Sequence, residues 1–216
     1  PVQTKRYPEA ARALQDLVLA GGDGYVARMA LAKVGIVQKD YAATEKQLNA
    51  ARRFDPDRAE PLFALAQLYE HTGRTELRIA TLKHFAELDQ QTFGEVATLV
   101  DLLSAKKAYA DVRTYGQMAF YIQPASPKLH QQLAEAYAAP APNSRLDRAI
   151  WHMETALLLD PPKPAQLHLR LAQFYVAAQK PQQAIAAAQR ALAIDAALTE
   201  AKTLLRTLRA REPTSR

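Results

Sequence analysis

The side chains that most often carry out chemistry in proteins are few in this sequence, and none stands in a known catalytic or metal-binding arrangement. The chain has five histidines and no cysteine, which excludes thiolate metal sites, thiol catalysis and disulfide bonds. The histidines form no HExxH or HxH pattern, so we predict no metal site. We expect His130 and His168 to pack in or beside the core; the other three histidines are His71, His84 and His152.

Nucleophiles and phosphate-binding loops are equally hard to find. No serine lies in a GxSxG sequence, which argues against a serine hydrolase. Residues 21–24 are rich in glycine, but they follow a predicted helix and lack the GxxxxGK[ST] pattern of a phosphate-binding loop. No two carboxylates can be paired as acid and base. We therefore predict that the chain is not an enzyme and needs no cofactor.

Composition and charge describe a folded chain with a modest positive excess. Apolar residues make up 49% of the 216 residues, enough to form a core. The net charge of +6 is spread along the chain and mixed with acidic residues, which argues against nucleic-acid binding. No apolar run approaches the roughly 18 residues of a membrane span, so we predict a soluble protein. Residue 1 is Pro rather than Met, and we expect the chain to be part of a longer protein.

A repeat of about 34 residues organises most of the sequence. Apolar-periodic stretches end at Asp55, Asp89 and Gln123, which are 34 residues apart, and again at Asp160 and Asp195 after 37 and 35 residues. A break halfway through each repeat divides it into two stretches. Each repeat is therefore predicted to be two helices of about 14 residues joined by a tight turn.

The residues within each repeat follow a common pattern. The first helix carries a Leu-Ala pair followed by Tyr, as at Leu65, Ala66 and Tyr69, and the second helix carries small residues at regular spacing. Pro marks the exit at Pro56, Pro124 and Pro161. Over about residues 25–196 this pattern resembles a tetratricopeptide repeat array of bacterial type. Small residues allow close helix approach, and the apolar faces are buried only when neighbouring repeats stack.

These observations predict an all-α fold: a right-handed superhelical α-solenoid of stacked antiparallel helix pairs in a single domain. A helix that opens at Pro8 precedes the repeats, a basic capping helix follows them, and Asn143 or Ser144 caps a helix after an inserted loop, residues 138–144. The predicted segments are the N-terminal helix, 8–21, five repeats, 25–58, 59–92, 93–126, 127–163 and 164–197, and the capping helix, 198–211.

The resemblance implies that the first helices line a concave groove that commonly binds peptides or a partner helix. The position of each residue relative to the Leu-Ala pair of its repeat indicates which side chains face this groove. Chaperone-binding members hold a carboxylate with clustered Lys, Asn and Arg, and the matching positions here lack that cluster, so we predict no carboxylate clamp. The predicted partner-binding residues are Met29, Lys33, Phe63, Gln67, His71, Asp101, Lys128, Gln131, Gln132, Glu135, Arg170 and Gln173.

We therefore expect a non-catalytic scaffold that binds a protein or peptide partner in this groove. Two alternatives stay open. One is that the chain is the C-terminal repeat module of a larger bacterial enzyme, such as a peptidase, and positions substrates or subunits. The other is that the chain also self-associates through its open N-terminal face. The sequence does not decide between the bacterial cytoplasm and the periplasm.

Overall fold

A computed structural model describes residues 2–89, 91–140 and 145–210, and within these ranges it contains twelve α-helices and no strand. The helices pack as antiparallel neighbours, with α2 on α3, α4 on α5, α8 on α9 and α10 on α11. This confirms the predicted all-α solenoid of helix pairs. The chain divides into two compact blocks, which we call the N-terminal block (Pro1–Glu95) and the C-terminal block (Val96–Arg216).

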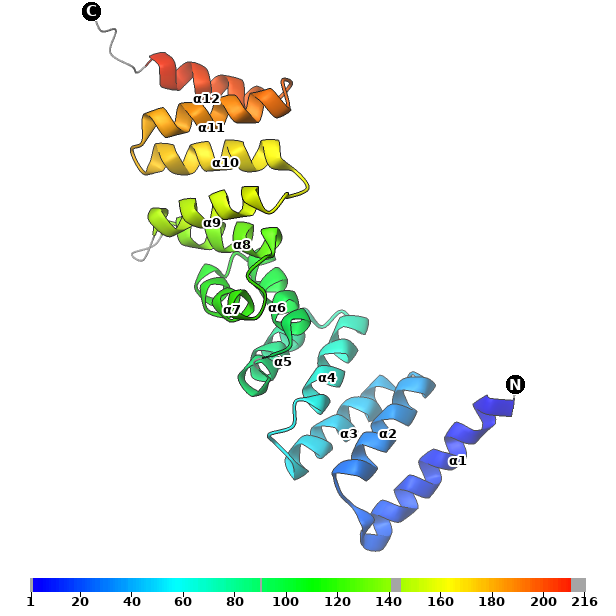
Figure 1. The fold of residues 1–216 in the computed structure, drawn as a ribbon. Coiled ribbons are helices and arrows are strands. Elements are labelled where there is room, and N and C mark those ends of the chain that lie inside the picture. The colour runs from blue at the N-terminus through cyan, green and yellow to red at the C-terminus, as the bar shows by residue number, and fades with distance from the viewer. Residues whose placement is uncertain (1, 90, 141–144, 211–216) are drawn as a thin grey trace, which may run out of the picture. The chain divides into compact units, whose positions relative to one another are not determined.

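The N-terminal block is a row of helices in chain order, with α1, α2 and α3 side by side (Figure 1). Asp40 caps α3, because its Oδ1 accepts a hydrogen bond of 2.9 Å from the backbone N–H of Ala43. The elements are α1 (Val2–Leu17), the π-helical turn η1 (Val18–Gly22), α2 (Tyr25–Gln38), α3 (Tyr41–Phe54), α4 (Glu60–His71) and α5 (Thr75–Leu88).

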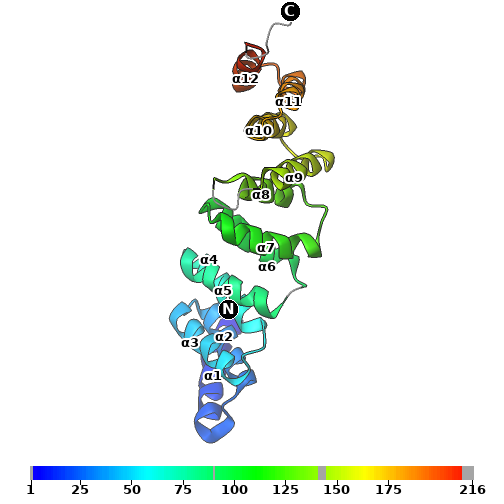
Figure 2. The same ribbon diagram turned by 90° about the vertical axis from the view of Figure 1, so that its left-hand side faces the viewer.

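In the C-terminal block, α10, α11 and α12 follow one another as neighbours in both views (Figures 1 and 2). Proline occupies the first turn of α8, α10 and α11, where its missing N–H costs no helical hydrogen bond. The elements are α6 (Phe93–Ala105), which begins just before the block boundary, α7 (Tyr109–Ile122), α8 (Pro127–Ala138), α9 (Leu146–Leu158), α10 (Pro164–Ala177), α11 (Pro181–Ile194) and α12 (Thr199–Ala210).

The N-terminal helix differs from its prediction. α1 begins at Val2, and Pro8 lies inside it instead of opening it. The fixed φ of proline is helical, so the ring is tolerated although it removes one hydrogen-bond donor from the helix. At the other end, the expected glycine stop is present: Gly21 has a φ of +91°, a left-handed conformation that costs glycine little.

Each block buries small residues where its helices meet. Ala32 and Ala66 in the N-terminal block, and Ala134 and Ala172 in the C-terminal block, are all buried. Gly116 of α7 faces Leu133 of α8 so closely that an added Cβ would lie 2.7 Å from Leu133 Cδ2. Side chains of this size let neighbouring helices approach.

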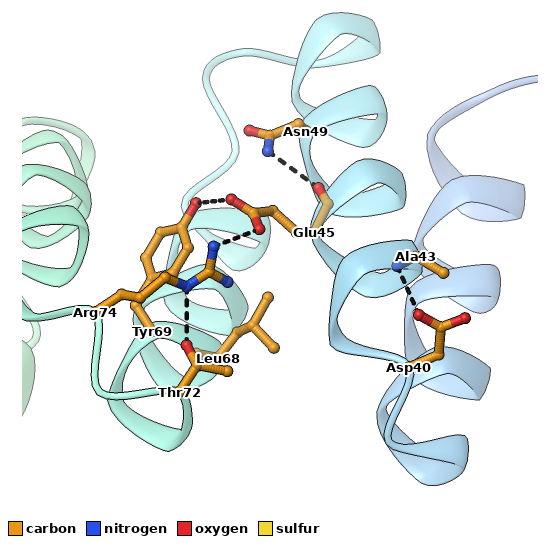
Figure 3. A network of polar contacts seen from close by, with 8 residues as sticks. All are labelled: Asp40, Ala43, Glu45, Asn49, Leu68, Tyr69, Thr72 and Arg74. Atoms are coloured by element: carbon orange, nitrogen blue, oxygen red, sulfur yellow. Dashed lines mark hydrogen bonds and ion pairs between the residues drawn. The ribbon is translucent and has the colours of Figure 1, made fainter.

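The repeated tyrosine of the first helix also links successive repeats through its hydroxyl group. Tyr69 donates a hydrogen bond of 2.8 Å to Glu45 Oε1 on α3, and Arg74 Nη1 lies 2.8 Å from the other carboxylate oxygen (Figure 3). Tyr175 likewise donates to Glu154. Burial, and then the hydrogen bond to the carboxylate, raises the pKa of Tyr69 to about 12, so the hydroxyl stays a donor.

The predicted cap of α9, Asn143 or Ser144, lies outside the residues that the structure describes. The residue directly before α9 is Arg145, whose side chain makes no capping hydrogen bond and instead pairs with Asp147. At the C-terminal end, α12 buries Ala201 and Leu208 and leaves Lys202, Arg206 and Arg209 exposed.

Candidate partner-binding face

The residues predicted to bind a partner lie on the first helices of the repeats, and we call their outward sides the first-helix face: α2 and α4 in the N-terminal block, and α6, α8 and α10 in the C-terminal block. The face includes exposed side chains at Lys33, Phe63, Gln67, His71, Lys128 and Gln131. It also includes half-buried side chains at Asp101, Gln132, Glu135, Arg170 and Gln173.

Met29 is the exception, because it is only 6% exposed and packs in the core with Leu48 and Tyr69. It lies three residues before buried Ala32 on the inward stripe of α2, and its flexible thioether chain fills core space readily. Met29 is therefore corrected from a surface position to a core position.

The N-terminal part of the face contains a hollow of about 320 Å³. Ile36 of α2, Tyr41 of α3 and Ala64 of α4 give it apolar walls, and Gln67 and His71 stand at its polar rim. The ring of Tyr41 meets the imidazole of His71 edge-on, with 6.1 Å between centroids. These residues come from three helices, and the sequence offered no signal for the hollow beyond the alignment of the repeats.

Gln67, which lines this hollow, and Lys33, which lies three residues before Ile36 on α2, have side chains that are free to bind. Among the described residues, no side chain or backbone group forms a hydrogen bond or ion pair with the side chains of Lys33 or Gln67. An amide can donate to and accept from an extended peptide backbone, and an ammonium group can bind a carbonyl or carboxylate. The N-terminal part of the face therefore combines an apolar recess with unsatisfied polar groups.

The C-terminal part of the face is different because its polar groups bind one another. Asp101 of α6 accepts hydrogen bonds of 2.7 Å from both Lys128 Nζ and Gln132 Nε2 of α8. Glu135 of α8 and Arg170 of α10 form a two-point ion pair, with N···O distances of 2.7 and 2.5 Å.

Arg170 is held by two further contacts on its own helix. Its Nη1 donates 2.8 Å to the side-chain oxygen of Gln173, and its guanidinium lies 4.7 Å from the ring centroid of Phe174. Glu135 raises the pKa of Arg170 through its hydrogen bond. Only Gln131, among the C-terminal residues predicted to bind a partner, is both exposed and without a polar contact in the part of the chain that the structure describes.

The sequence predicts a core or half-buried position for His130, but it does not predict that His130 contacts His152. His130 of α8 and His152 of α9 are 1% and 5% exposed, and their Nδ1 atoms lie 3.0 Å apart. His130 Nε2 lies 2.9 Å from the carbonyl oxygen of Pro124, which can only accept. His130 therefore carries its proton on Nε2, and its Nδ1 accepts from His152 Nδ1–H.

Aromatic rings enclose this imidazole pair. Phe120 approaches His130 edge-on at 5.5 Å between centroids, and Tyr137 stacks on His152 at 5.6 Å. Burial, then the neighbouring His130 and Arg148, lowers the pKa of His152 to about 4. Burial also lowers the pKa of His130. The pair is a neutral element of the core, and the 22-residue separation of its members gives no readable motif.

The described residues form neither a metal-ligand cluster nor a membrane-spanning helix. Within residues 2–89, 91–140 and 145–210, no three histidine, aspartate or glutamate side chains gather closely enough to hold a metal ion. No helix in the same ranges has the length and hydropathy needed to cross a membrane.

Comparison with known proteins agrees with this architecture. Residues 59–92 and 165–198 each match the family model of the tetratricopeptide repeat. The first match coincides with the predicted second repeat, and the second is shifted by one residue from the predicted fifth. No curated protein matches the chain.

Solved structures resemble the chain at low sequence identity. YrrB, described as a TPR protein with an unusual peptide-binding site, superposes with a TM-score of 0.63 at 13% identity, covering 90% of this chain and 98% of YrrB. The C-terminal part of a TPR protein from Cytophaga hutchinsonii gives 0.58 at 16% identity, covering 94% and 83%. MamA from Desulfovibrio magneticus RS-1 gives 0.54 at 16% identity, covering 82% and 97%. At these identities the likeness concerns the fold.

Proposed function

Because the chain is an array of tetratricopeptide repeats, we propose that it is a non-catalytic scaffold that binds a peptide or a helix of a partner protein on its first-helix face. The observation that supports this most directly is the hollow beside α2 and α4. It offers an apolar recess whose lining includes the free side chain of Gln67.

The proposed mode of binding follows from the chemistry of this recess. An apolar side chain of the partner occupies the space between Ile36 and Ala64, which removes apolar surface from water. Gln67 then hydrogen-bonds the partner's backbone, and Lys33 binds one of its carbonyl or carboxylate oxygens.

The test is affinity capture from a lysate of the source organism with the full chain as bait. Wild type is compared with a Gln67→Ala/His71→Ala variant by quantitative mass spectrometry. The control is Gln189→Ala/Lys202→Ala, which truncates two exposed polar side chains on α11 and α12. Circular dichroism checks that all three proteins are folded.

A partner that wild type and control retain and that the Gln67→Ala/His71→Ala variant loses would support the proposal. A partner retained equally by all three would contradict it, because binding would then not depend on the rim of the hollow. Recovery of no partner by the folded wild type would also count against a scaffold role.

A further inference from the structure

A second hollow lies in the C-terminal block, between the second helices α7 and α9, away from the residues of the first-helix face. It measures about 370 Å³, which is at the low end of the roughly 300–1,000 Å³ of typical ligand pockets. Phe120, Leu133 and the buried ring of His152 form its floor. One or two side chains of a partner would fill it.

Two exposed aromatic rings border this hollow. Tyr121 of α7 is 84% exposed, and Trp151 of α9, the only tryptophan of the chain, is 50% exposed. Phe120 joins the two helices, since its ring meets that of Trp151 at 6.2 Å between centroids. Single exposed apolar residues are common on protein surfaces, but Tyr and Trp around a recess are typical of binding sites.

The charge around the hollow is positive. Asp147 also lines it, but both of its oxygens are bound by Arg145, at 3.1 and 2.9 Å. Arg148 has no carboxylate partner in the described part of the chain, and its guanidinium lies 5.8 Å from the ring centroid of Tyr137. The available charge at this site is therefore a cation beside aromatic rings.

The neighbouring surface carries one more cation together with a carboxylate. Between α9 and α11 a further hollow is lined by Arg190, Glu154 and Leu158, and Leu158 is 85% exposed. Glu154 accepts the hydrogen bond of Tyr175, while Arg190 forms no ion pair with any residue the structure describes. Arg148 and Arg190 thus present two unpaired cations on the second helices of this block.

We propose that the hollow between α7 and α9 is a docking site for an acidic segment of a partner protein. The segment inserts one aromatic or large aliphatic side chain between Tyr121 and Trp151 and places a carboxylate against Arg148. Charge complementarity identifies this occupant. A second copy of the chain is disfavoured, because two molecules of net charge +6 repel one another.

The experiment uses the full chain and a phage library of random peptides of about 12 residues, a length suited to short-segment recognition. Peptides enriched on wild type are synthesised, and those without tryptophan are titrated while the emission of Trp151 is recorded. The test variant is Tyr121→Ala/Arg148→Glu. The matched control is Phe54→Ala/Arg53→Glu, which removes an exposed ring and reverses the adjacent cation on α3.

We expect enriched peptides that are acidic and contain an aromatic or large aliphatic residue, and that shift Trp151 emission to shorter wavelength as the indole leaves water. Affinity should fall by about tenfold or more in the test variant and by less than about twofold in the control. Affinity should also weaken as salt is raised.

Each other result would overturn the proposal: no enriched peptide, enrichment of basic or neutral peptides, or binding unchanged in the test variant. The Gln67→Ala/His71→Ala variant separates this site from the first-helix face. If that variant, and not Tyr121→Ala/Arg148→Glu, loses the peptides, they bind the first-helix face and the second-helix site is rejected.

Discussion

Equivalent positions on the first helices are paired in the C-terminal block and unpaired in the N-terminal block. In the C-terminal block, the residue after the Leu-Ala pair of one repeat binds the residue before that pair in the next repeat, as Glu135 binds Arg170. The same two positions in the N-terminal block are Lys33 and Ala64. Ala64 has no polar group, so Lys33 stays free and the space beside Ala64 remains as the hollow. The residues at these two positions thus distinguish a hollowed surface with a free lysine from a surface whose side chains pair with one another.

The interiors of the two blocks also differ, in how their histidines are placed. The C-terminal block buries the imidazole pair of His130 and His152. In the N-terminal block the described histidines are His71, which is exposed, and His84, which is half-buried and lies 2.9 Å from Arg52. Among the described histidines, the C-terminal block therefore holds a buried pair that is hydrogen-bonded to itself, whereas the N-terminal block holds no such pair.

The largest expected effect is a different acid sensitivity of the two blocks. At pH 7 the imidazole pair is neutral in both the folded and the unfolded chain. Below pH 6.5 the unfolded chain takes up protons that the folded chain does not, because the pKa of His152 is lowered to about 4 by burial, His130 and Arg148. The free energy of unfolding then falls as pH falls, by about 2–3 kcal/mol between pH 7 and 4.5.

Two other groups with shifted pKa values, one in each block, either act in the same direction or change their charge below this pH window. Burial and Arg190 lower the pKa of His168, which adds to the loss in the C-terminal block. In the N-terminal block, hydrogen bonds from Tyr69 and Arg74 outweigh burial and lower the pKa of Glu45, so the stability that Glu45 contributes is lost only below its ordinary pKa of 4.5.

Urea unfolding followed by Trp151 fluorescence reports on the C-terminal block, and hydrogen exchange of α3 and α4 reports on the N-terminal block. Equal losses in both blocks between pH 6.5 and 4.5 would contradict the comparison.

The next effect comes from removing one partner of the ion pair. Arg170→Ala leaves the half-buried Glu135 carboxylate without its cation and removes the guanidinium from the ring of Phe174. We expect a loss of about 1 kcal/mol in the free energy of unfolding, since the pair is partly exposed to water. Lys33→Ala in the N-terminal block should change it by less than about 0.5 kcal/mol. Urea unfolding followed by circular dichroism measures both, and equal effects would show that Glu135 and Arg170 contribute no more than free surface residues.

Much of the fold could be predicted because its signals are local. The helical periodicity is read within each repeat, and the regular spacing of Asp55, Asp89 and Gln123 is read along the chain without knowing which helices touch. The site was harder to predict, because pairs such as Glu135 and Arg170 depend on which positions of two repeats meet. Met29 was misplaced because alignment on the Leu-Ala pair does not distinguish an edge position from the core. His130 and His152 meet through packing alone.

A smaller effect is expected at Asp101. Asp101→Ala leaves Lys128 and Gln132 without their shared acceptor, but the side chains of Lys128 and Asp101 are 68% and 41% exposed, so water replaces the lost contacts. The free energy of unfolding should fall by about 0.5 kcal/mol or less, and the loss should shrink as salt screens the charges. Urea unfolding at low and high salt tests this. A loss above about 1 kcal/mol that does not depend on salt would show that Asp101 acts through packing.

The smallest change in stability, and the most direct test of the comparison, comes from transplanting the pair. Lys33→Glu/Ala64→Arg gives the N-terminal block the residues that Glu135 and Arg170 provide in the C-terminal block. The arginine should occupy the space beside position 64, pair with the new glutamate and stabilise the chain by about 0.5 kcal/mol or less. A double-mutant cycle with the two single variants measures the coupling. We expect favourable coupling together with loss of the captured partner. Favourable coupling with undiminished capture would show that the hollow beside Ala64 is not the binding site, and zero coupling would show that residue identity at these two positions does not account for the difference between the blocks.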